Sequence, residues 1–200
     1  MNESSGIMLA LLAAGQSRRF GDQDKLAASL GDRMLGLHAA EAAAGLPFAR
    51  KLVIGSPEHD CAPQWGALGY QMIANDAAAQ GQATSVRLAA AQAIASGASA
   101  LCIMLADMPF VTNGHIGRLI AAFEQEGGTR TTASTRHEQP MPPAIFPSGA
   151  LETLLGLTGD TGARKLLGDA LLIAGSDHLL TDIDTPEDLA EANRIAKQNE

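Results

Sequence analysis

The stretch Leu9–Leu26, LALLAAGQSRRFGDQDKL, decides the fold. It continues an apolar run that begins at Ile7 and ends at Leu12. An unbroken apolar run of this length predicts a strand buried on both faces, as in a parallel sheet. Three small residues, Ala13, Ala14 and Gly15, then break the run. We therefore expect a glycine-bearing turn at the carboxyl end of a central strand.

The residues after this turn indicate a phosphate-binding loop. Arg18, Arg19 and Lys25 supply positive charge, and a glycine turn leaves backbone N–H groups open to phosphate oxygens. The order A-G-x-S-x-R-x-G-x-x-x-K is not that of the usual P-loop, because Asp22 stands where that motif needs lysine. It is not the G-x-G-x-x-G fingerprint either. A basic surface loop without a ligand is the alternative, and the spacing disfavours it.

Composition limits the ligand to a small one. The chain has 200 residues, which suits one domain over 1–200, and its formal net charge is −8. A protein of this size that binds nucleic acid is normally basic. The basic loop is thus a local feature of an acidic protein, which favours a small polyanion.

The sequence gives no sign of a zinc site, a disulfide framework or a membrane span. The two cysteines, Cys61 and Cys102, and the five histidines show no ligand spacing. No apolar stretch reaches transmembrane length. The first apolar run follows Glu3 without any Lys or Arg, so it differs from a signal peptide. These features favour a cytoplasmic protein.

Strand and helix patterns alternate along the chain. Apolar runs predict strands at 7–12, 51–54, 70–74, 101–105, 131–135, 144–146 and 179–183. Periodic segments predict helices at 34–46, 59–68, 83–95, 112–123, 150–157, 163–167 and 185–197. Thr112 and Thr185 are the expected N-caps of two of them. This alternation predicts an α/β domain with a mainly parallel sheet, from which 129–146 is the segment expected to depart.

Carboxylates follow two of the expected strands. Asp107 lies between an apolar strand and Pro109, and Asp182 and Asp184 end the last expected strand. Ligands of open α/β sheets bind beyond the carboxyl ends of strands. Mg²⁺ there uses one or two carboxylates together with substrate phosphates. Because side chains alternate along a strand, we expect only one of Asp182 and Asp184 to reach the metal.

Six segments together resemble the nucleotidyltransferases of molybdenum cofactor biosynthesis, and among them the cytidylyltransferase group. They are spread over nearly the whole chain: LAAGQSRRFGDQDKL, GQATSV at 81–86, LADMPFVT at 105–112, PPAIF at 142–146, GDTGARKLL at 159–167 and DIDTPEDL at 182–189. The form LAAG, with Ala14, and GDTGAR are similar to the cytidylyl branch, whereas guanylyltransferases resemble LAGG.

The resemblance implies a three-layer, Rossmann-like α/β/α domain of the nucleotide-diphospho-sugar transferase type. It implies CMP transfer from CTP to the phosphate of a molybdopterin-type pterin, with Mg²⁺ and transient contact with a recipient apo-molybdoenzyme. By position, Gly15, Arg19 and Lys25 would hold the triphosphate, with Ala13 and Ala14 near base and sugar. Gly81 and Ser85 would contact cytosine. Asp107 would bind Mg²⁺, with Asp184 as the second ligand.

Other functions stay open from the sequence. The same loop suits a guanylyltransferase, or a cytidylyltransferase for another small phosphate. A protein that carries the nucleotide or cofactor without catalysis is a different class, and Lys25 and Asp107 favour catalysis over it. Ser85 near the start of a helix also suits simple capping.

Overall fold

The computed structural model describes residues 6–198 except 16, 18 and 22, and it describes only the backbone at 160–162, 165 and 196–198. Within this part β1, Ile7–Leu12, is the central strand, and all six of its residues are buried. It pairs in parallel with β4, Arg50–Gly55, and with β6, Ala100–Leu105. The first apolar run is therefore the doubly covered parallel strand that the sequence predicts.

The described residues form a seven-stranded sheet in the order β5-β4-β1-β6-β8-β7-β9. Only β8, Gln139–Pro147, runs antiparallel to its two neighbours, and this is the predicted departure from alternation. The remaining strands are β5 at Gln71–Ala74, β7 at Thr132–Arg136 and β9 at Leu171–Ala174. A separate two-stranded ribbon joins β2, Ser29–Leu30, to β3, Arg33–Met34.

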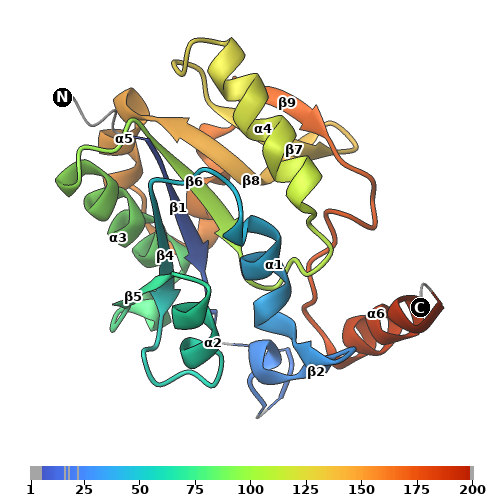
Figure 1. Cartoon of the computed structure of the whole chain (residues 1–200). Helices are drawn as coiled ribbons and strands as arrows, with labels where there is room; N and C mark the ends of the chain where they lie inside the picture. The colour runs from blue at the N-terminus through green and yellow to red at the C-terminus, as the bar shows by residue number, and fades with distance from the viewer. Residues whose placement is uncertain (1–5, 16, 18, 22, 199–200) are drawn as a thin grey trace.

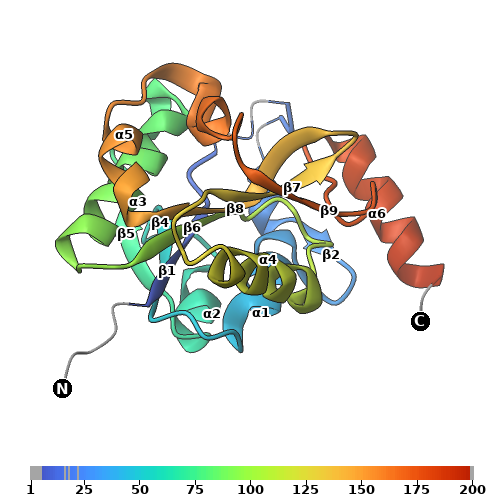
Figure 2. The ribbon, with the colours of Figure 1, turned by 90° about the horizontal axis from the view of Figure 1, so that it is seen from above.

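Helices cover both faces of the sheet (Figures 1 and 2). One layer contains α1 at Leu35–Ala44, α2 at Ala62–Ala67 and α4 at Asn113–Gln125. The opposite layer contains α3 at Gln82–Ala95, α5 at Leu151–Leu155 and the 3-10 segment η4 at Gly159–Leu166. Helix α6, Pro186–Gln198, packs beside β2 at the edge of the molecule. Shorter 3-10 turns are η1 at Lys25–Ala27, η2 at Ala78–Gln80 and η3 at Ser148–Ala150.

Alternate residues of β1 supply the two halves of the core. Leu9 and Leu11 pack in the cluster that contains Ile116 of α4. Met8 and Ala10 pack in the cluster that contains Val86 of α3. Burial on both sides explains why this strand reads as a continuous apolar run.

The two predicted N-caps are confirmed. The Thr112 hydroxyl accepts a hydrogen bond from the His115 backbone N–H at 3.3 Å. At α6 the Thr185 hydroxyl accepts from the Asp188 N–H at 3.1 Å, and the Asp188 carboxylate accepts from the Thr185 N–H at 2.8 Å. This reciprocal pair is a capping box.

The predicted strand at 179–183 is wrong, because the structure has irregular backbone there. Its apolar residues Leu180 and Ile183 are buried all the same, at 0% and 1% exposure. The edge strand is instead β9, which the sequence reading missed because its residues are half-buried or exposed in alternation. The predicted helix at 163–167 is also wrong in type, since this segment belongs to the 3-10 turn η4.

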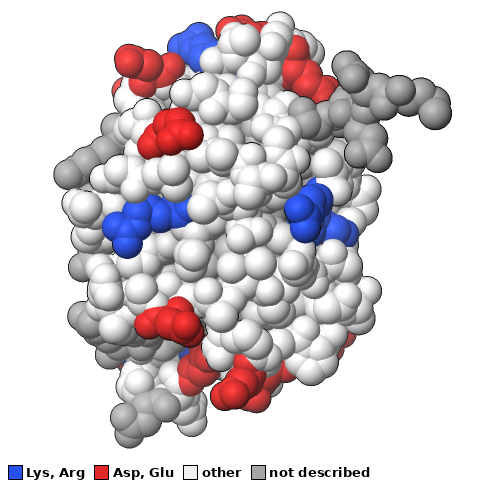
Figure 3. Space-filling model, turned by 90° about the vertical axis from the view of Figure 1, so that its left-hand side faces the viewer, with Lys and Arg blue, Asp and Glu red and all other residues white. Residues whose placement is uncertain are grey.

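No helix among the described residues is long and apolar enough to span a bilayer. The face drawn in Figure 3 carries scattered acidic side chains and isolated basic ones, with no continuous basic stripe among its coloured residues.

A series of buried hydrogen bonds joins α4 to the strands β7 and β8. His115 is 1% exposed, and its Nε2 donates to the Ser134 hydroxyl at 2.8 Å, which donates in turn to the Pro143 carbonyl at 2.9 Å. Arg118 donates to His115 Nδ1 at 2.9 Å. Burial, with the Arg118 charge, lowers the pKa of His115 to about 4.

The buried position of His115 in this series of hydrogen bonds predicts that stability depends on pH. His115 stays neutral when folded but takes up a proton near pH 6.5 when unfolded. The unfolded chain then binds more protons, so the free energy of unfolding should fall as pH is lowered from about 6.5 to about 4. Urea unfolding at several pH values should show a shallower fall for His115→Gln. Equal slopes for wild type and His115→Gln would contradict the account.

Candidate active site

The first loop begins where β1 ends. The Ala13 N–H donates to the Ile54 carbonyl at 2.9 Å, which ties the loop to β4. A Cβ built on Gly15 would meet no heavy atom within 4 Å, so this glycine borders open space. Ser17, at a φ of 46°, accepts the Lys25 backbone N–H at 3.3 Å and holds the two ends of the loop together. The predicted cationic residue Arg18, with Asp22, lies outside the described residues.

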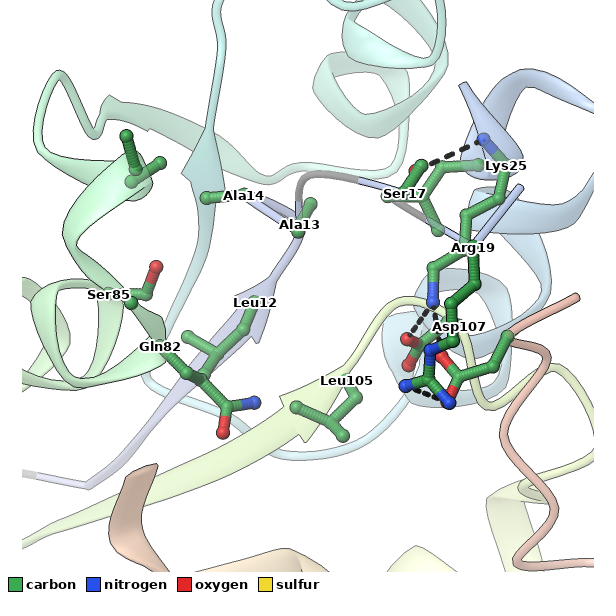
Figure 4. Close-up of a pocket in the computed structure, with 16 residues that line it drawn as sticks. Leu12, Ala13, Ala14, Ser17, Arg19, Lys25, Gln82, Ser85, Leu105 and Asp107 are labelled. Atoms are coloured by element: carbon green, nitrogen blue, oxygen red, sulfur yellow. Dashed lines mark hydrogen bonds and ion pairs between the residues drawn. The ribbon is translucent and has the colours of Figure 1, made fainter. Parts of the chain in front are cut away.

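This loop forms one wall of a cavity of about 350 Å³ (Figure 4). The cavity brings together most of the residues that the sequence nominated. They come from the loop, from η1, from the start of α3 and from the ends of β6 and the last loop: Ala13, Ala14, Gly15, Arg19, Lys25, Gly81, Ser85, Asp107 and Asp184. Residues as far apart in the chain as Ala13 and Asp184 thus meet at the carboxyl ends of the parallel strands, as the switch-point rule expects.

The side chain of Lys25 lies at the centre of this wall. Its ammonium group donates to Asp107 Oδ2 at 2.6 Å, to Asp184 Oδ1 at 3.0 Å and to the Ile183 carbonyl at 3.0 Å. Three acceptors match the three donors of an ammonium group. The resemblance implies that Lys25 holds the triphosphate, whereas in this structure its side chain is only 8% exposed and is held by carboxylates.

The charges of this cluster shift each other's protonation. Burial alone would lower the pKa of Lys25, but Asp107 and Asp184 outweigh it and raise that pKa above its ordinary value. Burial raises the pKa of Asp107, although Lys25 opposes the shift. Arg19 extends the cluster outward, with Nη2 at 2.8 Å from Asp184 Oδ2 and a side chain that is 72% exposed.

Asp107 and Asp184 have the chemistry for a divalent cation. Asp107 Oδ1 is buried and has no hydrogen-bond partner in the described structure, so one carboxylate oxygen is left available. The described residues contain no group of three or more His, Cys, Asp or Glu that could hold a metal by themselves. Two carboxylates completed by substrate phosphates are the usual Mg²⁺ arrangement, and this pair fits it.

The expectation that only one of Asp182 and Asp184 reaches the metal assumed that side chains alternate along a strand. The structure has no strand at these residues, so that reason does not apply. Asp184 lines the first cavity and contacts Lys25, whereas Asp182 lines only a second cavity beside it. The Asp182 charge still contributes to the raised pKa of Asp107. Asp184 is therefore the carboxylate that shares the lysine with Asp107.

The opposite end of the first cavity is the start of α3. Gly81 has a φ of 107°, a conformation that side chains rarely adopt. The Asn75 amide donates to the hydroxyls of Thr84 at 3.0 Å and Ser85 at 2.8 Å. Because the Ser85 oxygen accepts this bond, its own proton is free to face a ligand. The sequence reading missed Asn75, whose one signal was its place directly after a strand.

A second cavity of about 530 Å³ adjoins the first. The two share five lining residues: Leu12, Gln82, Leu105, Asp107 and Asp184. The walls of the second are mostly apolar and include Val86, Ile103 and Phe146. Arg164, from the GDTGAR segment, is the one cation among its described lining residues. Gln82 and Arg164 were not nominated from the sequence.

Known proteins match the chain over nearly its whole length. Residues 9–191 match the family described as the MobA-like NTP transferase domain. The chain is 32% identical to the Purine catabolism protein PucB of Bacillus subtilis (strain 168), over 88% of this chain and 91% of that protein. It is 28% identical to the Molybdenum cofactor guanylyltransferase of Cereibacter sphaeroides, over 94% of this chain and 96% of that one.

Solved structures confirm the predicted nucleotide-diphospho-sugar transferase-like α/β fold. One of them is Rv0371c from Mycobacterium tuberculosis H37Rv in complex with manganese. It superposes with a TM-score of 0.72 at 21% identity, over 94% of this chain and 97% of that one.

The lysine cluster predicts unequal effects of two substitutions on stability. Lys25→Met leaves two carboxylates without their shared cation, so it should lower the free energy of unfolding at pH 7 by roughly 2 kcal/mol. This loss is smaller than that expected for a wholly buried charge, because both carboxylates are partly exposed to solvent. Asp107→Asn removes a carboxylate whose charged form burial disfavours, so it should change stability much less. Chemical denaturation of both variants measures this. Equal losses, or a stable Lys25→Met protein, would contradict the assigned role.

Proposed function

The chain belongs to the MobA-like NTP transferase family, and we propose that it transfers CMP from CTP to the phosphate of a molybdopterin-type pterin, with release of pyrophosphate. The observation that carries the proposal is the meeting of two cavities at Asp107 and Asp184. A group-transfer enzyme needs its donor and acceptor on either side of one reacting centre. Membership of a nucleotidyltransferase family supports the reaction type, and two adjoining cavities support separate positions for donor and acceptor.

The first cavity suits the nucleotide. Gly15 and Arg19 line it, and a backbone N–H group at the glycine and the Arg19 guanidinium can hold the triphosphate. Ala13 and Ala14 lie next to the base and sugar in this arrangement. Gly81 and Ser85 lie at the other end, where the Ser85 hydroxyl can donate to the cytosine edge.

Cytosine is the proposed base because of Ala14. A methyl group at that position narrows the cavity relative to a glycine, which favours a pyrimidine over a larger purine. The similarity to a guanylyltransferase keeps GTP as the second candidate. The two nucleotides share every phosphate contact, so only the base end of the cavity can distinguish them.

The second cavity suits the acceptor. Its apolar walls can pack against the flat body of a heterocycle, and Arg164 can balance an anionic group. An acceptor seated there would present its phosphate towards Asp107 and Asp184, which both cavities share.

The chemistry requires no general base. An oxygen of the acceptor phosphate, already anionic near neutral pH, forms a bond to the α-phosphorus of CTP, and the bond from that phosphorus to pyrophosphate breaks. Catalysis then consists of positioning and of stabilising the redistributed charge. Asp107 and Asp184 would hold Mg²⁺, which supplies neutralisation of phosphate charge when bound. Arg19 and Lys25 add positive charge on the same side.

The transfer reaction itself tests the proposal. With Mg²⁺ and a phosphorylated pterin, CTP should release pyrophosphate at least tenfold faster than GTP or ATP. Asp107→Asn should lower this rate by about a hundredfold or more while the protein stays folded, as expected when a preorganised charge contact is removed. Faster pyrophosphate release with GTP than with CTP would change the proposed base from cytosine to guanine. Release that does not depend on an acceptor phosphate would refute the transfer reaction.

Arg164 tests the acceptor cavity separately. Arg164→Ala should raise the KM for the phosphorylated pterin about tenfold or more, because one charge-assisted contact is lost, while the Kd for CTP stays unchanged. Arg194→Ala, at an exposed site on α6, serves as the matched control. An effect of Arg164→Ala on CTP binding alone would place that side chain in the nucleotide site instead.

A further inference from the structure

The ammonium group of Lys25 occupies the space between the two carboxylates that fit a divalent cation. It contacts one oxygen of Asp107 at 2.6 Å and one oxygen of Asp184 at 3.0 Å (Figure 4). Its third donor is used by the Ile183 carbonyl at 3.0 Å. A cation on the chain itself therefore already balances part of the negative charge of the carboxylate pair.

We propose that Lys25 is a tethered substitute for the metal, and that metal and nucleotide consequently bind as a coupled pair. The proposal deepens the proposed function and depends on only one part of it, the metal-holding role of Asp107 and Asp184. A divalent cation ligated by both carboxylates needs the lone pairs that the ammonium now uses. Two cations at one place repel strongly in a partly buried site.

The displaced ammonium needs a new partner. It is part of the wall of the first cavity, and its own backbone N–H is bonded to Ser17 of the phosphate loop. A triphosphate in that cavity supplies anionic oxygens within reach of the same side chain. Without the nucleotide, the ammonium would leave its three acceptors and gain only water.

The consequence is a thermodynamic linkage. A divalent cation alone must displace Lys25 without compensation, so it binds weakly. With the nucleotide present, Lys25 exchanges carboxylate partners for phosphate partners, and the metal binds more tightly. Linkage is reciprocal, so the metal must tighten nucleotide binding by the same factor.

Arg19 provides a contrast within the same cluster. It also pairs with Asp184, at 2.8 Å, but through the other carboxylate oxygen and from an exposed position. Removal of Arg19 takes away one positive charge near the metal pair without opening the space between the two carboxylates. A general effect of charge on metal affinity would therefore appear equally in Arg19 and Lys25 variants, whereas direct competition would appear in Lys25 variants alone.

The experiment measures Mn²⁺ binding to the whole chain without nucleotide, from the electron paramagnetic resonance signal of free Mn²⁺. Lys25→Met should bind Mn²⁺ at least tenfold more tightly than wild type, and Arg19→Gln less than threefold more tightly. Lys25→Gln, which keeps two N–H donors on a side chain one atom shorter, is the second variant should the methionine protein not fold. Equal gains in the Arg19 and Lys25 variants would overturn the proposal.

Wild-type protein supplies an independent measurement. CTP, and separately GTP, should each tighten Mn²⁺ binding beyond the affinity of Mn²⁺ for that nucleotide in buffer, and Lys25→Gln should reduce this coupling. Using both nucleotides makes the outcome independent of base selection. Coupling that is absent in wild type would overturn the proposal. Neither readout involves turnover, so a failure of CMP transfer would leave this result standing, and a failure here would leave the transfer reaction standing.

Discussion

The positive charge of Lys25 is the interaction on which the site depends. It forms ion pairs with both Asp107 after β6 and Asp184 in the loop before α6, two residues separated widely in the chain. Without a cation between them, two carboxylates in a partly buried position would repel each other. The lysine therefore stabilises the ligand-free fold and at the same time holds together the groups that a metal would need.

The parallel sheet makes this meeting possible. The strands β1 and β6 are direct neighbours, so the loops that follow them leave the sheet side by side. The Ile183 N–H donates to the Asp107 carbonyl at 2.9 Å, which fixes the last loop against the end of β6. Helix α3 lies at the far end of the first cavity, and Gln82 at its start borders both cavities. The two cavities thus share lining residues at the ends of β1 and β6 and at the start of α3.

The sequence predicted those parts of the structure that local patterns determine. The run Ile7–Leu12 reads as a doubly buried strand because both of its faces pack against helices, and the α6 capping box needs only residues 185–188. The strand β9 was missed because an edge position leaves alternate residues exposed. The direction of the Lys25 side chain could not be predicted, since its partners are 82 and 159 residues away. The same holds for Asn75, whose role comes from its contact with α3.

The central claim is that the space between Asp107 and Asp184 holds Lys25 without ligands and a metal with them. A crystal structure of the protein with CTP and Mn²⁺, without acceptor, tests it most directly through the anomalous signal of manganese. The account predicts a manganese peak ligated by Asp107 and Asp184, with Lys25 Nζ within hydrogen-bond distance of the triphosphate. A manganese peak on the phosphates alone, with Lys25 still bonded to both carboxylates, would contradict it.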